Sequence, residues 1–285
     1  MPASAGAAGS GFKAGSRFRE NDAEAGAVSE NRREGVLKVQ YAGIYFDTIQ
    51  KLLGRIWDSQ KEAMEKAVNV MTTCAEQGGL IHVFGCGHTQ ILVEEVWFRA
   101  GQPSFISPIF DQGLWPHNAP HKGSALEKLE GYGKLIFENH DAKPGEVIII
   151  LSNSGRNAAP VEVALEAKKR GLTVVAITSM DYSTRVKSRH SSGKRLFEIA
   201  DIVIDNAGPE GDAVVQIPGL KQKAGPCTTI TNAAILDAML VQVVANLVAR
   251  KGSAPVFVSA NLDVPGDVNE DYIAPYLLRI HHYKG

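Results

Sequence analysis

Three short segments of the chain place hydroxylated side chains directly after an apolar run. They are GCGHT at 85–89, SNSG at 152–155 and the SMDYS segment that begins at Ser179. Serine hydroxyls can donate to phosphate oxygens, and glycine lets backbone N–H groups come close to an anion. No lysine completes a nucleotide-binding P-loop in SNSG. The segments therefore predict a neutral cup that binds phosphate reversibly, centred on Ser152 and Ser154. The alternatives are a tight turn without a ligand for GCGHT and a helix cap for SNSG, although capping alone explains three such junctions less well.

Several side chains near these segments could transfer protons. His88 lies inside the first glycine loop, and Glu94 follows it by about a turn and a half of a predicted helix. Glu130 lies three residues after Glu127, so the two share a helix face. Ser124 and Glu127 fit a capping box, which favours a structural role for Glu127 and leaves Glu130 as the better base. A solvated surface position is the alternative for each glutamate.

The elements that position these residues begin with helical periodicity. Apolar residues recur at helical spacing over Val36–Leu53 and again over Arg55–Glu76. Gly54 predicts a break or a kink between two helices, and Gly78 with Gly79 predicts the end of the second. The sequence therefore indicates an N-terminal helical pair.

After residue 79 the pattern alternates between strands and helices. The expected strands are Leu80–Phe84, Ser104–Ile109, Glu146–Leu151, Thr173–Thr178 and Ile202–Ile204, and the expected helices are Gln90–Arg99, Ser124–Asn139, Pro160–Arg170 and Thr228–Arg250. Such alternation is typical of a parallel sheet covered by helices on both faces, a three-layer αβα sandwich. Ligands of these sheets bind at the carboxyl ends of the strands, where the hydroxylated segments fall.

Composition limits the classes of partner and location. Thirty basic residues stand against thirty-one acidic ones in 285 residues, so no global positive field favours nucleic acid. Three cysteines are too few for a disulfide framework and suit the cytoplasm. The longest apolar run, Ala233–Ala249, contains Asp237, Gln242 and Asn246, which indicates a buried helix and no membrane span.

The expected organisation is a tail followed by one domain. Small residues and mixed charge over 1–35 predict a disordered tail. Residues 36–285 are expected to form a single domain with helices over 36–77, an αβα core over 78–250 and a C-terminal extension over 251–285.

The glycine loop, the SNSG element after an apolar strand and the AITSMDYS segment together resemble the sugar isomerase (SIS) domain family over about residues 41–250. The resemblance implies a flavodoxin-like αβα fold that binds phosphosugars and commonly dimerises. It implies ligand contacts from the glycine loop, from the SNSG loop and from the third strand–helix junction. The residues concerned are Gly85, Gly87, Thr89, Ser152, Asn153, Ser154, Gly155 and Ser179. Phosphoheptose isomerases of the family bind zinc through a histidine on the helix after the first loop, where this chain has Glu94 and Glu95, so no metal and no cofactor are expected.

The sequence leaves two functional hypotheses and a third alternative without a functional site. The first is an aldose–ketose sugar-phosphate isomerase or related lyase, with Glu130, Glu94 and His88 as the acid/base candidates. The second is a non-catalytic phosphosugar sensor, a role that SIS domains also have. The third alternative is an αβα scaffold whose site has decayed. The expected partners are a phosphorylated sugar and a second copy of the chain, with no nucleic acid or membrane.

Overall fold

The computed structural model describes residues 39–117, 119–263 and 268–284, and the expected tail over 1–35 lies outside them. Residues 44–285 form one compact unit, whereas of the unit over residues 1–43 only the start of a helix is described. The strands are β1 (Ile81–Gly85), β2 (Ile106–Ile109), β3 (Val147–Leu151), β4 (Thr173–Thr178), β5 (Ile202–Asp205), β6 (Ala213–Val215) and β7 (Ala224–Pro226). The helices are α2 (Gln40–Glu76), α3 (Gln90–Glu95), α4 (Pro120–Leu126), α5 (Tyr132–Glu138), α6 (Ala158–Lys169), α7 (Met180–Ser183), α8 (Thr228–Lys251) and α9 (Val268–Ile273).

The main sheet has five strands in the order β2-β1-β3-β4-β5, and every neighbouring pair is parallel. This is the flavodoxin-like order, so the predicted αβα architecture with a parallel sheet is confirmed. The chain order reverses between β1 and β3, which makes the carboxyl ends of these two strands the topological switch point.

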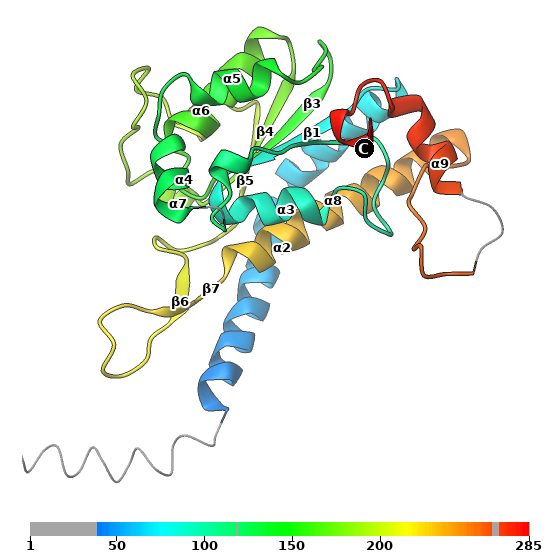
Figure 1. Cartoon of the computed structure of the whole chain (residues 1–285). Coiled ribbons are helices and arrows are strands. Elements are labelled where there is room, and N and C mark those ends of the chain that lie inside the picture. The colour runs from blue at the N-terminus through cyan, green and yellow to red at the C-terminus, as the bar shows by residue number, and fades with distance from the viewer. Residues whose placement is uncertain (1–38, 118, 264–267, 285) are drawn as a thin grey trace, which may run out of the picture. The chain divides into compact units, whose positions relative to one another are not determined.

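Alternate residues of the strands face two separate apolar layers. Val83, Ile149 and Val175 pack with side chains of α2, α3 and α8, whereas Ile148 and Val174 pack with α5 and α6. Figure 1 shows α5 and α6 over one face of the sheet and α2 and α8 over the other. Both faces are covered, which explains why the strand sequences are apolar throughout and lack alternation.

The predicted break at Gly54 was wrong, because α2 is one continuous helix of 37 residues. A single glycine inside a helix costs only about 1 kcal/mol. The buried side chains of the second half, among them Met64, Val68 and Met71, pack on the sheet and outweigh that cost. The helix ends where expected, with Gly78 at a φ of 78°.

Two regions differ from their predicted secondary structure. The helix expected over 124–139 is two helices, because Gly131 adopts a φ of 88° and separates α4 from α5. The antiparallel hairpin of β6 and β7 was not predicted. Its strands have three residues each, too few for a periodic signal.

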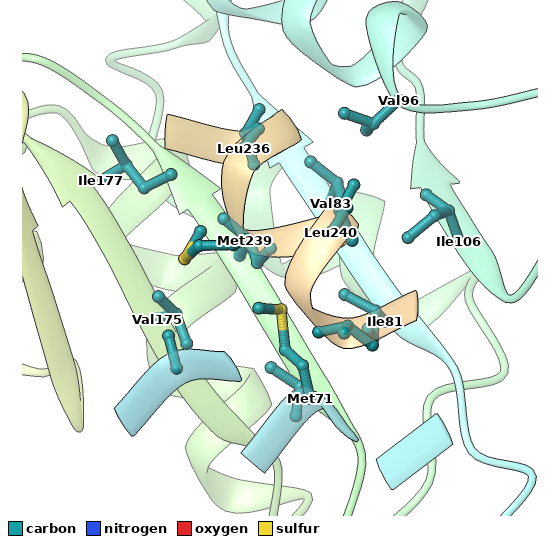
Figure 2. Packing of buried hydrophobic residues seen from close by; sticks show 14 of the residues in the cluster. Met71, Ile81, Val83, Val96, Ile106, Val175, Ile177, Leu236, Met239 and Leu240 are labelled. Carbon is teal, nitrogen blue, oxygen red and sulfur yellow. The ribbon is translucent and has the colours of Figure 1, made fainter. Parts of the chain in front are cut away.

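Helix α8 is long and apolar enough to cross a membrane by length and composition. In the fold, however, its Leu236, Met239 and Leu240 lie against the sheet residues Ile81, Val83 and Ile177 (Figure 2). That packing explains the apolar composition of the buried face.

The C-terminal segment is attached at the amino ends of the strands, opposite the switch point. Glu146, directly before β3, is buried and accepts hydrogen bonds from the Leu80 N–H (2.9 Å), His82 Nε2 (3.0 Å), the Lys143 N–H (2.8 Å) and Arg279 Nη1 (2.7 Å). Burial alone would raise the pKa of Glu146, but these hydrogen bonds lower it to about 2. A carboxylate so well satisfied stays ionised and holds Arg279 in place.

Candidate functional site

A cavity of about 630 Å³ lies at the switch point. The loops after β1 and β3, the end of α4, the hairpin of β6 and β7 and the start of α8 form its wall. The lining residues are Cys86, Gly87, His88, Thr89, Glu127, Ser152, Asn153, Ser154, Tyr182, Gly211, Asp212, Ala213, Lys223, Ala224, Gly225, Pro226 and Thr229. The cavity therefore brings together most of the residues of the two loops that the sequence singled out.

The serine loop after β3 is shaped as a cup. Ser152 Oγ accepts from the Gly155 N–H at 3.2 Å, which leaves the hydroxyl proton of Ser152 able to donate. The Ser154 hydroxyl makes no hydrogen bond to any residue that the structure describes. Gly155 has a φ of 56°, and a Cβ there would lie 3.1 Å from Leu196 Cβ, so the turn needs glycine. Helix α6 begins three residues later, so its free N–H groups lie next to this loop.

The Asn153 side chain, which the resemblance assigned to the ligand, is engaged within the protein. Its amide N–H donates to Thr228 Oγ1 at 2.7 Å, and its carbonyl oxygen accepts from Asn206 Nδ2 at 2.8 Å. These bonds tie the serine loop to the start of α8 and the end of β5. Asn153 therefore holds the cup in place and exposes only part of its surface to the cavity.

The glycine loop after β1 is closed by Thr89. The Thr89 hydroxyl accepts from the Cys86 N–H at 2.8 Å and donates to the Cys86 carbonyl at 2.7 Å. A Cβ at Gly85 would lie 2.6 Å from Thr89 Oγ1, so only glycine allows this closure. Thr89 and Gly85 thus shape the loop, whereas Gly87 and His88 contribute surface to the cavity.

Ser179 does not face the cavity. It is fully buried, and its hydroxyl donates to the Gly208 carbonyl at 2.5 Å and accepts from the Tyr182 N–H at 3.1 Å. It is the N-cap of α7, so here the helix-cap alternative describes the residue better than ligand binding.

Glu127 lines the cavity, and the capping box predicted for it was wrong. Helix α4 begins at Pro120 after the N-cap Ala119, which puts Ser124 inside the helix and Glu127 at its C-cap. Glu127 Oε1 accepts from Asn157 Nδ2 at 2.9 Å. This amide orients the carboxylate and leaves its second oxygen for a ligand.

Glu130 and Glu94 lie outside the cavity. Glu130 accepts from the backbone N–H and the hydroxyl of Ser191, at 2.7 and 2.6 Å, and these bonds hold its pKa below the usual value. A carboxylate so engaged anchors the loop around Ser191 and is a weak base. Glu94 is exposed on α3 and lines a neighbouring cavity of about 390 Å³, which shares Gly87 and His88 with the first.

The hairpin contributes charged residues that the sequence reasoning missed. Asp212, just before β6, accepts from the N–H groups of Cys227 and Thr228 at 3.1 and 2.8 Å, and so caps α8. Lys223, just before β7, lies at the rim. A glycine-rich stretch around 208–225 was the available signal, but it does not specify which residues return to the sheet edge.

The thiols of Cys86, in the cavity wall, and of Cys227, at the start of α8, are poor nucleophiles. Burial raises the pKa of Cys86 well above its usual value, and burial together with the Asp212 carboxylate raises that of Cys227 to about 12. Within the described ranges, no group of three or more His, Cys, Asp or Glu side chains is arranged to hold a metal ion. Glu127 and His88 are two side chains of the cavity wall that could transfer protons.

Comparison with known proteins confirms the resemblance. The model of the SIS domain matches residues 44–179. A UPF0309 protein of Caldanaerobacter subterraneus is 40% identical over 242 residues, covering 84% of this chain and 98% of that protein. The chain belongs to the UPF0309 family. Another UPF0309 protein, from Shouchella clausii, is 38% identical over 86% of this chain and 100% of its own length.

A solved structure shares the fold of this UPF0309 protein. The phosphoheptose isomerase of Neisseria gonorrhoeae superimposes with a TM-score of 0.50, covering 72% of this chain and 98% of that one, at 15% identity. The similarity concerns the fold alone.

Proposed function

We propose that this protein binds a phosphorylated sugar in the cavity, with the phosphate in the serine loop. The observation that carries this proposal is the Ser154 hydroxyl, which has no partner among the described residues and lines the cavity beside Ser152. Two hydroxyl donors and the nearby N-terminus of α6 complement the oxygens of a phosphate monoester. Arg156, the cation of this loop, is not among the residues that line the cavity, which suits a phosphate that is held and not transferred.

The proposed reaction is aldose–ketose isomerisation with Glu127 as the base. Glu127 removes the proton from the carbon next to the sugar carbonyl, and His88 donates a proton to the carbonyl oxygen to give an enediol. A proton then returns to the original carbonyl carbon, and the hydroxyl on the adjacent carbon loses its proton to become the new carbonyl. These two transfers complete the isomerisation. Glu127 replaces Glu130 and Glu94 in this role because it lines the cavity and they do not.

A panel of hexose, heptose and amino-sugar phosphates tests binding first. A ligand at 100 times its dissociation constant stabilises the native state by about 2.7 kcal/mol, which a thermal-shift assay detects. Proton NMR in D2O then tests turnover, because isomerisation exchanges the proton next to the carbonyl for deuterium. Glu127→Gln should abolish exchange and keep binding, and Glu94→Gln serves as the matched control outside the cavity. If no sugar phosphate binds, the proposal fails.

A sensor is the second candidate, and one observation favours it. Of the two carboxylates in the cavity wall, Asp212 is occupied by the N–H groups of α8, which leaves Glu127 alone for chemistry. Ligand binding without deuterium exchange for any sugar phosphate would assign the protein to this class.

We also propose a cytoplasmic location and the pairing of two copies. The three cysteines are free and buried, which supports the cytoplasm, where sugar phosphates are found. Phe46 and Trp57 on α2 are 68% and 55% exposed, which supports pairing of two copies through this helix. Sedimentation equilibrium on the wild type and on Trp57→Glu tests this assembly, since a charge at the contact should favour the monomer.

A further inference from the structure

The hairpin of β6 and β7 forms one side of the cavity. Residues from both strands line it, namely Gly211 to Ala213 and Lys223 to Pro226. The hairpin follows β5 and leads directly into α8, so it is a part of the wall that neither phosphate-loop motif includes.

The base of the hairpin is held by contacts to Tyr45 and to the start of α8. The Tyr45 hydroxyl donates to the Pro226 carbonyl at 2.6 Å. The Tyr45 ring lies against Gly225, where a Cβ would come within 2.8 Å of the ring and the φ is 76°. On the other strand, Asp212 is fixed by the N-terminus of α8. Lys223, two residues before Gly225, therefore starts from an anchored backbone at the cavity rim.

Lys223 is the unpaired charge of this wall. Among the described lining residues, the carboxylates Glu127 and Asp212 both accept hydrogen bonds from the protein. Lys223 makes no hydrogen bond or ion pair with any described residue, although it lines the cavity. The serine loop already supplies neutral donors for one phosphate. A cation from a different element is thus available for another group of the ligand.

We propose that Lys223 recognises a second anionic group on the substrate, a carboxylate or a second phosphoryl group, while the serine loop holds the first phosphate. This inference rests on the proposed binding of a sugar phosphate and narrows it to sugar phosphates with two anionic groups. Lys223 acts as a specificity-determining residue, and its ion pair is partly exposed, so its contribution weakens as salt is added.

Two matched pairs of probes isolate the second anion. 6-Phosphogluconate differs from glucitol 6-phosphate by a carboxylate in place of an alcohol, and fructose 1,6-bisphosphate differs from fructose 6-phosphate by a phosphoryl group. Calorimetry at low salt should show that the wild type binds the two-anion member of at least one pair more tightly. Lys223→Ala should weaken that member about three- to fivefold and leave its one-phosphate counterpart unchanged.

Two variants serve as controls. Lys223→Arg should restore the preference because it keeps the charge, and Lys221→Ala should leave it intact because Lys221 lies on the same hairpin outside the cavity lining. The pair that responds identifies the second group as a carboxylate or a phosphoryl group.

Other results would overturn the inference. If Lys223→Ala weakens the binding of both members of a pair equally, Lys223 contacts the first phosphate. If the affinity for neither member changes, Lys223 is a solvated side chain. If the wild type binds one-phosphate sugars but no two-anion sugar more tightly, the inference alone fails. If it binds no sugar phosphate, the proposed function fails with it.

Discussion

At the scale of single residues, Ser154 and Ser179 show that the same residue type serves different purposes. Ser179 is buried and satisfies its hydroxyl on Gly208 and Tyr182. The Ser154 hydroxyl has no partner among the described residues and borders the cavity. A serine that is unsatisfied by the protein at a cavity is available to a ligand, whereas a satisfied one is part of the framework.

Ser154→Ala should therefore affect binding and leave stability unchanged. Loss of one hydrogen bond to a charged phosphate costs about 1.5–3 kcal/mol, which raises the dissociation constant for a sugar phosphate about tenfold or more. Calorimetric titration measures the dissociation constant. The melting temperature of the ligand-free variant is the control, and a large fall in it would instead give the hydroxyl a structural role.

At the scale of elements, two glycines have opposite requirements. Gly54 lies inside the continuous helix α2, and nothing lies within 4 Å of a Cβ built there. Gly85 closes the loop after β1, where a Cβ would meet Thr89 Oγ1 at 2.6 Å and the Thr89 carbonyl oxygen at 2.7 Å. Gly54 therefore lowers the stability of its helix, whereas the turn at Gly85 requires glycine.

Gly54→Ala should stabilise the protein by about 0.5–1 kcal/mol, because alanine loses less backbone entropy in a helix. Urea unfolding measures the change. A loss of stability would mean that the helix bends or separates at this position, as the sequence first suggested.

Gly85→Ala should destabilise the protein by about 1–3 kcal/mol, since the added methyl group forces apart the backbone around Thr89. It should also weaken sugar-phosphate binding, because Thr89 shapes the glycine loop. Urea unfolding and calorimetry test the two effects separately. Unchanged stability and affinity would show that the loop can close without glycine.

The sequence predicted those elements whose signal is local. The apolar runs of β3 and β4, and the glycine that ends α2, appear where residue type and spacing indicated them. The hairpin of β6 and β7 is held by Tyr45, which lies 181 residues before Pro226, and by a hydrogen bond from the Thr228 N–H back to Asp212. Glu127 reaches the cavity because α4 begins four residues before Ser124, a boundary that the capping pattern misplaced. Packing partners, which local patterns do not contain, decide both.

At the scale of the whole molecule, Glu146 joins the start of the sheet to the C-terminal segment through Arg279. Its pKa in the native state is about 2, against an ordinary value of 4.5. A carboxyl group with a lowered native pKa stabilises the fold above its ordinary pKa and loses that contribution as the pH falls towards 2. The difference corresponds to about 3 kcal/mol at neutral pH.

Glu146→Gln should therefore lower the free energy of unfolding by about 3 kcal/mol at pH 7, and the gap from the wild type should close between about pH 5 and pH 2. Urea unfolding across this range measures it. A gap that does not change with pH would show that the carboxylate is not ionised in the native state.

The packing of α8 in the core limits where the chain can be truncated. The family match ends at Ser179, ahead of β5 and α8. Leu236, Met239 and Leu240 nevertheless cover the central strands. A fragment terminated at the end of that match would expose the strand residues that α8 covers and would be prone to aggregate. Any excised version must therefore retain α8, and it must reach Arg279 to keep the ion pair with Glu146.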